Sequence, residues 1–233
     1  MCGCKIYKMS KRFFKRILGF VPTPTFKGKD NFIREYNFIK ELGMDKSILN
    51  VGSGAKNLGR AVINLDIYPF ENVNIIAKAE EMPFKDESFD GVIFNGVIQH
   101  VDKPKEAVRL MYRILKKGGQ IYAEVPFMTP FIKDYYTQPN DFQRYTLSGV
   151  EQLFSDFRTI NKGVMGGPSS AFTWILKEYL AILLSFNNPF LYKLFFTVFS
   201  WVLLPIKYLD IFLENNRFAY KIASGFYYQG VKE

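Results

Sequence analysis

Between residues 48 and 126 the chain alternates short apolar runs with turn-forming residues, a pattern typical of buried strands. Runs of this kind predict strands at residues 48–51, 61–66, 73–77, 90–95 and 120–126. An amphipathic pattern at residues 31–42 predicts a helix that leads into the first strand.

A second helix is predicted from about residue 103 to residue 117, where Ala107, Met111 and Ile114 fall on one face. Asp102 is placed to cap its start, and the pair Gly118 and Gly119 is placed to end it. Strands that alternate with helices predict an α/β fold with a mainly parallel sheet.

After residue 166 the chain becomes rich in Phe, Leu and Tyr. Its longest uncharged apolar stretch lies between Lys193 and Lys207 and holds 13 residues. A helix that crosses a bilayer needs about 20 residues, so we expect a buried or membrane-surface helix here. The apolar excess has three interpretations: a membrane-docking surface, a homodimer face or an enlarged core.

The chain thus divides into a basic amphipathic arm (1–30), a core (31–165) and an apolar, helical C-terminal region (166–233). The arm holds eight Lys or Arg and one acid, and so carries most of the formal net charge of +9. A basic arm next to an apolar region suits an anionic membrane surface better than nucleic acid, for which we expect no role. A solvated arm without any partner is the alternative.

Cysteine and histidine are scarce, with two Cys near the N-terminus and one His. This composition excludes a disulfide framework and offers no metal site, and it suits a reducing, cytoplasmic location.

Candidate chemistry begins where the first strand runs into Gly52 and Gly54. Glycines at this position let a ligand approach the backbone closely. Asp66 closes the second strand, where an acid can accept the two hydroxyls of a ribose. The interval from Gly52 to Asp66 is 14 positions, shorter than the roughly 20 typical of an NAD site. This spacing disfavours an NAD or nucleotide-sugar enzyme.

Further along, the chain reads AEEMPFKDESFD, then GVIFN, VIQHV and RILKKGG. In this order and spacing, residues 45–165 resemble the type 11 branch of the class I S-adenosylmethionine-dependent methyltransferases. The resemblance implies a Rossmann-like, mainly parallel, seven-stranded sheet with helices on both faces. The methyl donor would lie across the strand ends.

The resemblance also implies the roles of individual residues toward S-adenosylmethionine. Gly52 and Gly54 would face its amino acid part, and Asp66 its ribose. Ala79 and Glu80 would border the adenine, and Asn95 the sulfonium.

Two positions depart from the family pattern. Lys78 stands where an acid usually precedes the Ala-Glu pair, and Gln99 stands where a Glu often precedes His100. Both departures keep open a catalytically inactive homologue that serves as a membrane scaffold.

On the acceptor side, His100 is a candidate general base, with hydrogen bonding of its loop as the structural alternative. The run from Pro139 to Thr146 resembles a subgroup associated with surface glycans and lipid-linked sugars. It makes Asp141, Arg144 and Tyr145 candidate acceptor-binding residues; a structural ion pair and a helix start are the alternative. The resulting expectation is methyl transfer to a hydroxyl of a glycan or lipid-linked acceptor, by a protein peripheral to the cytoplasmic membrane.

Overall fold

The computed structural model describes residues 22, 29–131 and 140–233, with the side chains of 29–33 left out. The basic arm predicted at residues 1–30 therefore lies almost wholly outside the described residues.

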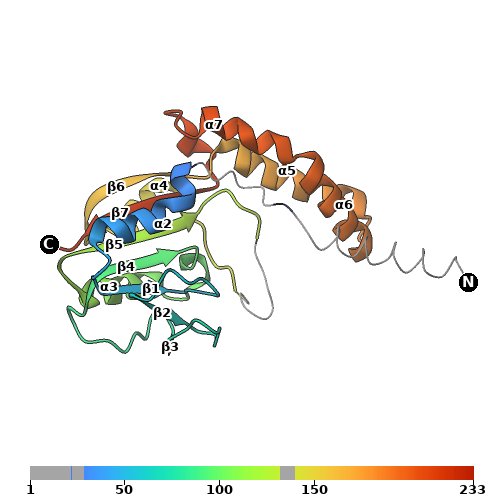
Figure 1. Cartoon of the computed structure of the whole chain (residues 1–233). Helices are drawn as coiled ribbons and strands as arrows, with labels where there is room; N and C mark the ends of the chain where they lie inside the picture. The colour runs from blue at the N-terminus through green and yellow to red at the C-terminus, as the bar shows by residue number, and fades with distance from the viewer. Residues whose placement is uncertain (1–21, 23–28, 132–139) are drawn as a thin grey trace, which may run out of the picture.

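A seven-stranded sheet forms the centre of the molecule, with the strand order β3-β2-β1-β4-β5-β7-β6 (Figure 1). The strands are β1 (Ile48–Val51), β2 (Val62–Asp66), β3 (Ile75–Ile76), β4 (Phe89–Asn95), β5 (Leu115–Pro126), β6 (Arg158–Met165) and β7 (Gly225–Val231). The first five strands are parallel, and β7 runs antiparallel to both of its neighbours. The predicted mainly parallel, seven-stranded sheet is confirmed.

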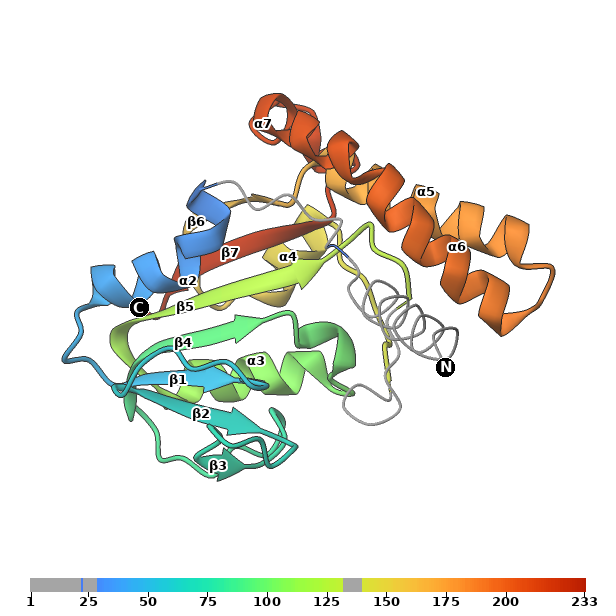
Figure 2. The same ribbon diagram turned by 45° about the vertical axis from the view of Figure 1, so that its right-hand side comes forward.

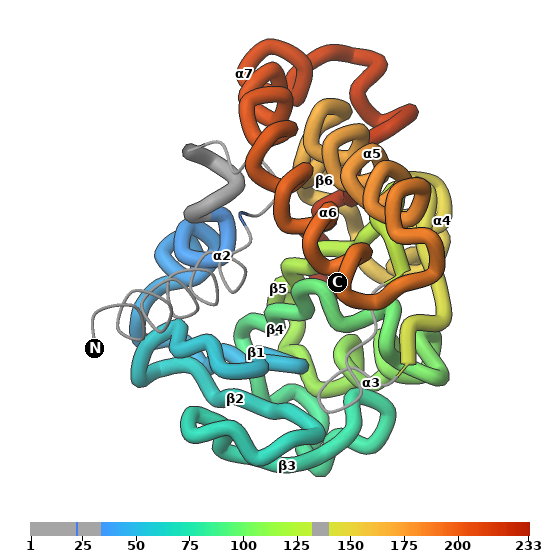
Figure 3. Tube along the Cα trace, turned by 90° about the vertical axis from the view of Figure 1, so that its right-hand side faces the viewer, coloured from blue at the N-terminus to red at the C-terminus, as the bar shows by residue number. Residues whose placement is uncertain are grey.

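Helices cover both faces of the sheet, as the view along the strands shows (Figure 3). On one face, α2 (Lys29–Leu42) buries Phe38 and Ile39 in a small cluster with Ile48 and Val62. On the other face, α3 (Pro104–Ile114) and α4 (Leu147–Leu153) pack into the larger core. The predicted apolar face of α3 is confirmed, since Ala107, Met111 and Ile114 are all buried.

The predicted end of α3 is wrong. The helix stops at Ile114 and the chain passes directly into β5, so Gly118 and Gly119 lie inside that strand. Pairing of β5 with β4 slips there: Leu115 faces Phe89, and the next pair is Gln120 with Gly91. Gly118 has a φ of +76°, which a glycine adopts without strain. The two glycines therefore form an irregularity at the start of the strand instead of a helix cap.

The C-terminal region contains the helices α5 (Pro168–Ser185), α6 (Pro189–Val202) and α7 (Asp210–Leu213) and the short 3-10 helices η2 (Leu204–Leu209) and η3 (Ala219–Lys221). The prediction of a helical region up to residue 233 is wrong at its end. Residues 225–231 form β7, which lies in the sheet between β5 and β6. Met165 at the end of β6 pairs with Gly225 at the start of β7. Residues 168–222 are thus an insertion between two neighbouring strands, which we call the helical insertion.

The helical insertion projects from the sheet on the side to which β4 and β5 point (Figures 1 and 2). None of the described helices is by itself long and apolar enough to cross a membrane. The pair Pro189–Val202 and Leu204–Leu213 passes that test jointly, with a 42° bend between its parts.

Candidate functional site

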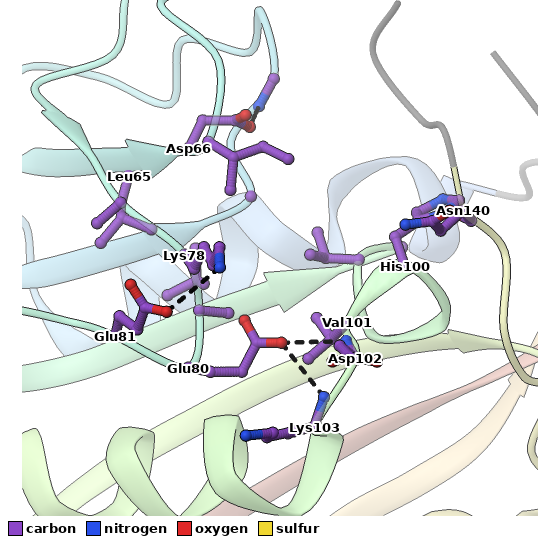
Figure 4. Close-up of a pocket in the computed structure, with 18 of the residues that line it drawn as sticks. Leu65, Asp66, Lys78, Glu80, Glu81, His100, Val101, Asp102, Lys103 and Asn140 are labelled. Carbon is purple, nitrogen blue, oxygen red and sulfur yellow. Dashed lines mark hydrogen bonds and ion pairs between the residues drawn. The ribbon is translucent and has the colours of Figure 1, made fainter. Parts of the chain in front are cut away.

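A cavity of about 1210 Å³ opens at the carboxyl ends of β1, β2 and β4. Side chains from these strands and from the loops that follow them converge on it (Figure 4). Seven residues with a predicted role at the site line the cavity. Six were predicted to bind the methyl donor, and the seventh, His100, is the candidate base: Gly52, Gly54, Asp66, Ala79, Glu80, Asn95 and His100. In parallel α/β sheets this edge is where ligands bind.

The glycine turn after β1 is shaped for close approach. Gly52 has a φ of +69°, and an added Cβ would stand 2.2 Å from a methyl group of Val97. Gly54 has a φ of +53°, and an added Cβ would meet nothing within 4 Å. Gly52 is therefore required by packing within the protein, whereas Gly54 leaves open space beside the cavity.

Asp66 is buried at the tip of β2 and holds the turns around it. One carboxylate oxygen accepts a hydrogen bond from Gly54 N at 2.8 Å, and the other accepts from Tyr68 N at 3.0 Å. Each carboxylate oxygen has a second lone pair, so the group retains capacity for ligand hydroxyls.

Glu80 contacts the two residues that precede α3, across the cavity wall. One carboxylate oxygen accepts from the backbone N–H groups of Asp102 at 3.0 Å and Lys103 at 3.2 Å. The predicted cap at Asp102 is wrong, because the N-cap position is Lys103 and no side-chain cap bond is formed there. A carboxylate from a distant loop satisfies backbone donors at this helix start instead.

Lys78 also lines the cavity, with its amine 3.3 Å from a carboxylate oxygen of Glu81. Both of these side chains are well exposed, so the pair is a weak surface ion pair. The described lining contains five carboxylates and two lysines, a charge balance that suits a cationic ligand.

Asn95, at the tip of β4, has one satisfied and one unsatisfied polar atom. Its amide donates to Glu35 of α2, and Glu35 also pairs with Lys56 at 2.6 Å. Its oxygen is buried without a hydrogen-bond partner among the described residues. A buried acceptor of this kind is costly unless a ligand or water donates to it. No sequence pattern pointed to Glu35, because an acid on an amphipathic helix is ordinary.

His100 has both ring nitrogens engaged. Gln99 places its amide nitrogen 2.7 Å from the carbonyl oxygen of Gly96 and 3.0 Å from His100 Nε2. The amide must donate to that carbonyl, so it also donates to the imidazole, whose Nε2 accepts. Nδ1 then carries the hydrogen and donates to the carbonyl oxygen of Asn140. The neutral imidazole joins the loop after β4 to the segment at residue 140.

The predicted acceptor-binding residues lie outside the cavity lining. Arg144 forms a two-pronged ion pair with the buried carboxylate of Asp141 and also donates to Thr129 and Pro130. Tyr145 packs against the larger core, and burial raises the pKa of its hydroxyl. These contacts fasten the segment that leads into α4. They match the structural alternative given for these residues.

The described residues contain no group of three or more His, Cys, Asp or Glu side chains placed to hold a metal ion.

Part of the core resembles a known family. Residues 42–123 match the family model described as methyltransferase domain. An uncharacterised protein of Methanocaldococcus jannaschii is 34% identical over 71 residues, which are 30% of this chain and 35% of that protein. The ubiquinone/menaquinone biosynthesis C-methyltransferase of Pectobacterium atrosepticum is 37% identical over 88 residues, which are 37% of this chain and 35% of that enzyme. The matched part of the chain thus spans about a third of the length of these relatives.

Solved structures share the fold at low identity. The [4+2]-cyclase SpnF superposes with a TM-score of 0.52 at 12% identity, covering 98% of this chain and 94% of the cyclase. A putative sarcosine dimethylglycine methyltransferase from Galdieria sulphuraria gives a TM-score of 0.51 at 14% identity, covering 96% of this chain and 98% of that one. Residues 42–123 therefore resemble a methyltransferase domain, and the chain has the Rossmann-like fold that these solved structures share.

Proposed function

We propose that the protein transfers a methyl group from S-adenosylmethionine to a hydroxyl of a glycan or lipid-linked acceptor at the cytoplasmic face of a membrane. The observation that carries the donor assignment is the unpaired oxygen of Asn95, buried at the wall of a cavity that the glycine turn leaves open.

The lining offers each part of the donor a chemically suitable partner. Asn95 would border the sulfonium, and its unpaired oxygen could accept from the ammonium group a few atoms away. Gly54 leaves room for the amino acid part of the donor. Asp66 accepts from ribose hydroxyls through its remaining lone pairs. Ala79 and the second oxygen of Glu80 lie where the adenine would rest.

Methyl transfer is an in-line displacement. The acceptor oxygen forms a bond to the methyl carbon while the carbon–sulfur bond breaks, and the hydroxyl proton passes to water. Such a reaction depends mainly on positioning of the two reactants. Neutral His100, with both nitrogens engaged, fixes the loop on the acceptor side. In this arrangement it holds Asn140 and the segment that follows in place.

The acceptor and the membrane location rest on a sequence resemblance and on the place of the helical insertion. Asp141 and Arg144 resemble a glycan-associated subgroup in sequence but form an internal clamp. The helical insertion lies on the side of the sheet where the cavity opens, so a lipid-linked acceptor held at a membrane would be near the donor (Figure 2). A homodimer formed through the same apolar surface is the alternative partner. The charge distribution gives no reason to propose nucleic acid.

Calorimetry with S-adenosylhomocysteine, the donor product, tests the proposal. We expect saturable one-site binding and none with NAD. A radiolabelled methyl group should then pass from S-adenosylmethionine to a component of membrane extracts. No heat with S-adenosylhomocysteine would favour the alternative of an inactive membrane scaffold. One observation supports that alternative: a carboxylate oxygen of Glu80 is already bonded to the backbone at the start of α3.

A further inference from the structure

The helical insertion has an inverted distribution of polarity. Between residues 168 and 213, the apolar residues that are buried are only alanines, Ala171 and Ala181. The other buried side chains of this span are polar, among them Thr173, Lys177 and Asp210. Large apolar side chains face outward instead; Phe186 is 80% exposed and Phe212 is 77% exposed.

Charge is almost absent from the outer surface of this span. Lys193 is the single charged residue that is exposed between residues 168 and 213, all of which the structure describes. Ile182, Phe190 and Val202 are each more than 60% exposed and come from different parts of the helical pair. On proteins in water, large apolar surface patches mark contacts with a partner or a membrane.

Four of the buried hydroxyls are satisfied within their own helices. Thr173, Ser185, Thr197 and Ser200 each donate to a carbonyl oxygen three or four positions earlier, at 2.7–2.9 Å. Hydroxyls of helices in lipid bond in this way, because no water is present to accept from them. Small and hydroxyl-bearing residues between helices are likewise typical of packing inside membranes.

The charged groups between the helices are engaged as well. Asp210, fully buried, accepts from the backbone N–H groups of Ser169 and Ser170 at 2.8 Å and so caps the start of α5. The amine of Lys177 lies 4.2 Å from the ring centre of Phe196. Between residues 168 and 213 the buried side chains are thus mostly polar, and the exposed ones are mostly apolar.

Basic side chains stand at the base of the helical insertion, where it returns to the sheet. The guanidinium of Arg217 lies 4.5 Å, and the amine of Lys221 5.2 Å, from the ring centre of Phe218. Cations beside an exposed aromatic ring suit the boundary between acyl chains and phosphates. A protein partner would instead be expected to meet a patch with a polar rim.

We propose that the helical insertion embeds in one leaflet of a lipid bilayer, with Arg217 and Lys221 at the level of the phosphates. Lys193 is exposed, and no single helix within the described residues 168–213 is long and apolar enough to cross a bilayer. Both observations favour helices that lie along the leaflet over helices that cross it. This anchoring stands whether or not the core transfers a methyl group.

Tryptophan fluorescence tests the proposal directly. Both tryptophans of the chain, Trp174 and Trp201, lie in the helical insertion, so Trp174→Phe leaves Trp201 as the only one. The full chain is mixed with phosphatidylcholine vesicles that carry bromine atoms on their acyl chains. We expect the emission of Trp201 to shift to shorter wavelength and to be quenched, in low and in high salt.

Matched substitutions locate the contact. Phe212→Glu should lower partitioning into neutral vesicles about tenfold or more, since a charge placed among acyl chains is costly. Ile160→Glu, at an exposed position of β6, should leave partitioning unchanged. Circular dichroism and calorimetry with S-adenosylhomocysteine on the same samples report folding and the donor site independently.

Three results would each overturn the anchoring. The first is that Trp201 of the Trp174→Phe chain is not quenched, and the second is that the chain binds only anionic vesicles and is released by salt. The third is that light scattering shows a dimer that buries Trp201 and does not bind vesicles. None of these depends on methyl transfer, so failure of the anchoring and failure of the proposed function are distinguishable.

Discussion

At the scale of single residues, the state of His100 follows from its neighbour. The amide of Gln99 is fixed by the carbonyl of Gly96, and this orientation makes it a donor toward the imidazole. A glutamate at position 99 would place a carboxylate against that same carbonyl oxygen. The glutamine that replaces the family's usual glutamate at position 99 is therefore consistent with a neutral His100 that positions the loop.

His100→Phe tests whether the imidazole acts as a base. The substitution removes the imidazole partner of the Gln99 amide and of the Asn140 carbonyl. We expect it to lower the free energy of unfolding by about 1–3 kcal/mol in urea denaturation. The shape of the profile of kcat/KM against pH should stay the same, although turnover falls. Disappearance of the acidic limb of that profile would show that the imidazole takes the proton after all.

Two glycines provide a matched test of the donor site. Gly54 and Gly118 both have positive φ and open space where a Cβ would stand, but only Gly54 borders the cavity. Alanine at either position should cost about 1–2 kcal/mol of stability, because the left-handed conformation is unfavourable with a Cβ. Gly54→Ala should also weaken S-adenosylhomocysteine binding in calorimetry, whereas Gly118→Ala should not. Equal affinities would place the donor elsewhere.

At the scale of elements, Glu80 connects the adenine side of the cavity to the start of α3. Its carboxylate accepts two backbone N–H groups that the helix itself cannot satisfy. A donor bound next to Glu80 would therefore also stiffen the first turn of α3.

Glu80→Ala should lower the free energy of unfolding by about 1 kcal/mol, the usual cost of losing a helix cap. Glu81→Ala is the control, since that side chain is exposed and forms a surface ion pair with Lys78. Hydrogen exchange of the Asp102 and Lys103 amides should accelerate in the first variant alone. Unchanged exchange in Glu80→Ala would mean that another group caps the helix.

Elements built from local pattern were predictable, and those built by distant pairing were not. The predicted 48–51 strand matches β1, because a strand buried on both faces is a continuous apolar run. The edge strand β6 is mostly exposed and carries no such run. β7 follows a long apolar stretch that conceals its boundary. The cap from Glu80 joins positions 22 residues apart, which no local pattern reveals.

The same contrast applies to the candidate site. Gly52 and Gly54 follow β1, and Asp66 ends β2, so the parallel strands bring all three to one edge. Their convergence on the cavity was therefore predictable. The contact of Glu35 with Asn95 depends on how α2 packs across the sheet. The internal pairing of Asp141 with Arg144 depends on tertiary burial that a motif does not report.

At the scale of the whole molecule, the chain is a methyltransferase-fold core with a helical unit placed between two neighbouring strands. The shared fold alone does not determine the reaction, since the cyclase SpnF has a similar architecture. The separation of cavity and helical insertion in the sequence suggests that donor binding and membrane contact can be divided experimentally.

The attachment of the helical insertion makes this division practicable. Where it leaves and re-enters the sheet, Ser224 donates from its backbone N–H to the carbonyl oxygen of Gly166 at 2.9 Å, and Met165 pairs with Gly225. Replacing residues 168–222 by a short glycine-containing turn would join β6 and β7 as an ordinary antiparallel hairpin.

We expect this shortened chain to keep the far-ultraviolet signature of the core and its affinity for S-adenosylhomocysteine, because the cavity takes all of its described lining from residues 51–142. It should no longer float with phosphatidylcholine vesicles in a density gradient, since the exposed apolar surface is removed. Methyl transfer to a lipid-linked acceptor in vesicles should fall much more than transfer to the same acceptor in detergent. A shortened chain that folds but loses donor affinity would show that the helical insertion contributes to the cavity, and one that still floats would place the membrane contact in the rest of the chain.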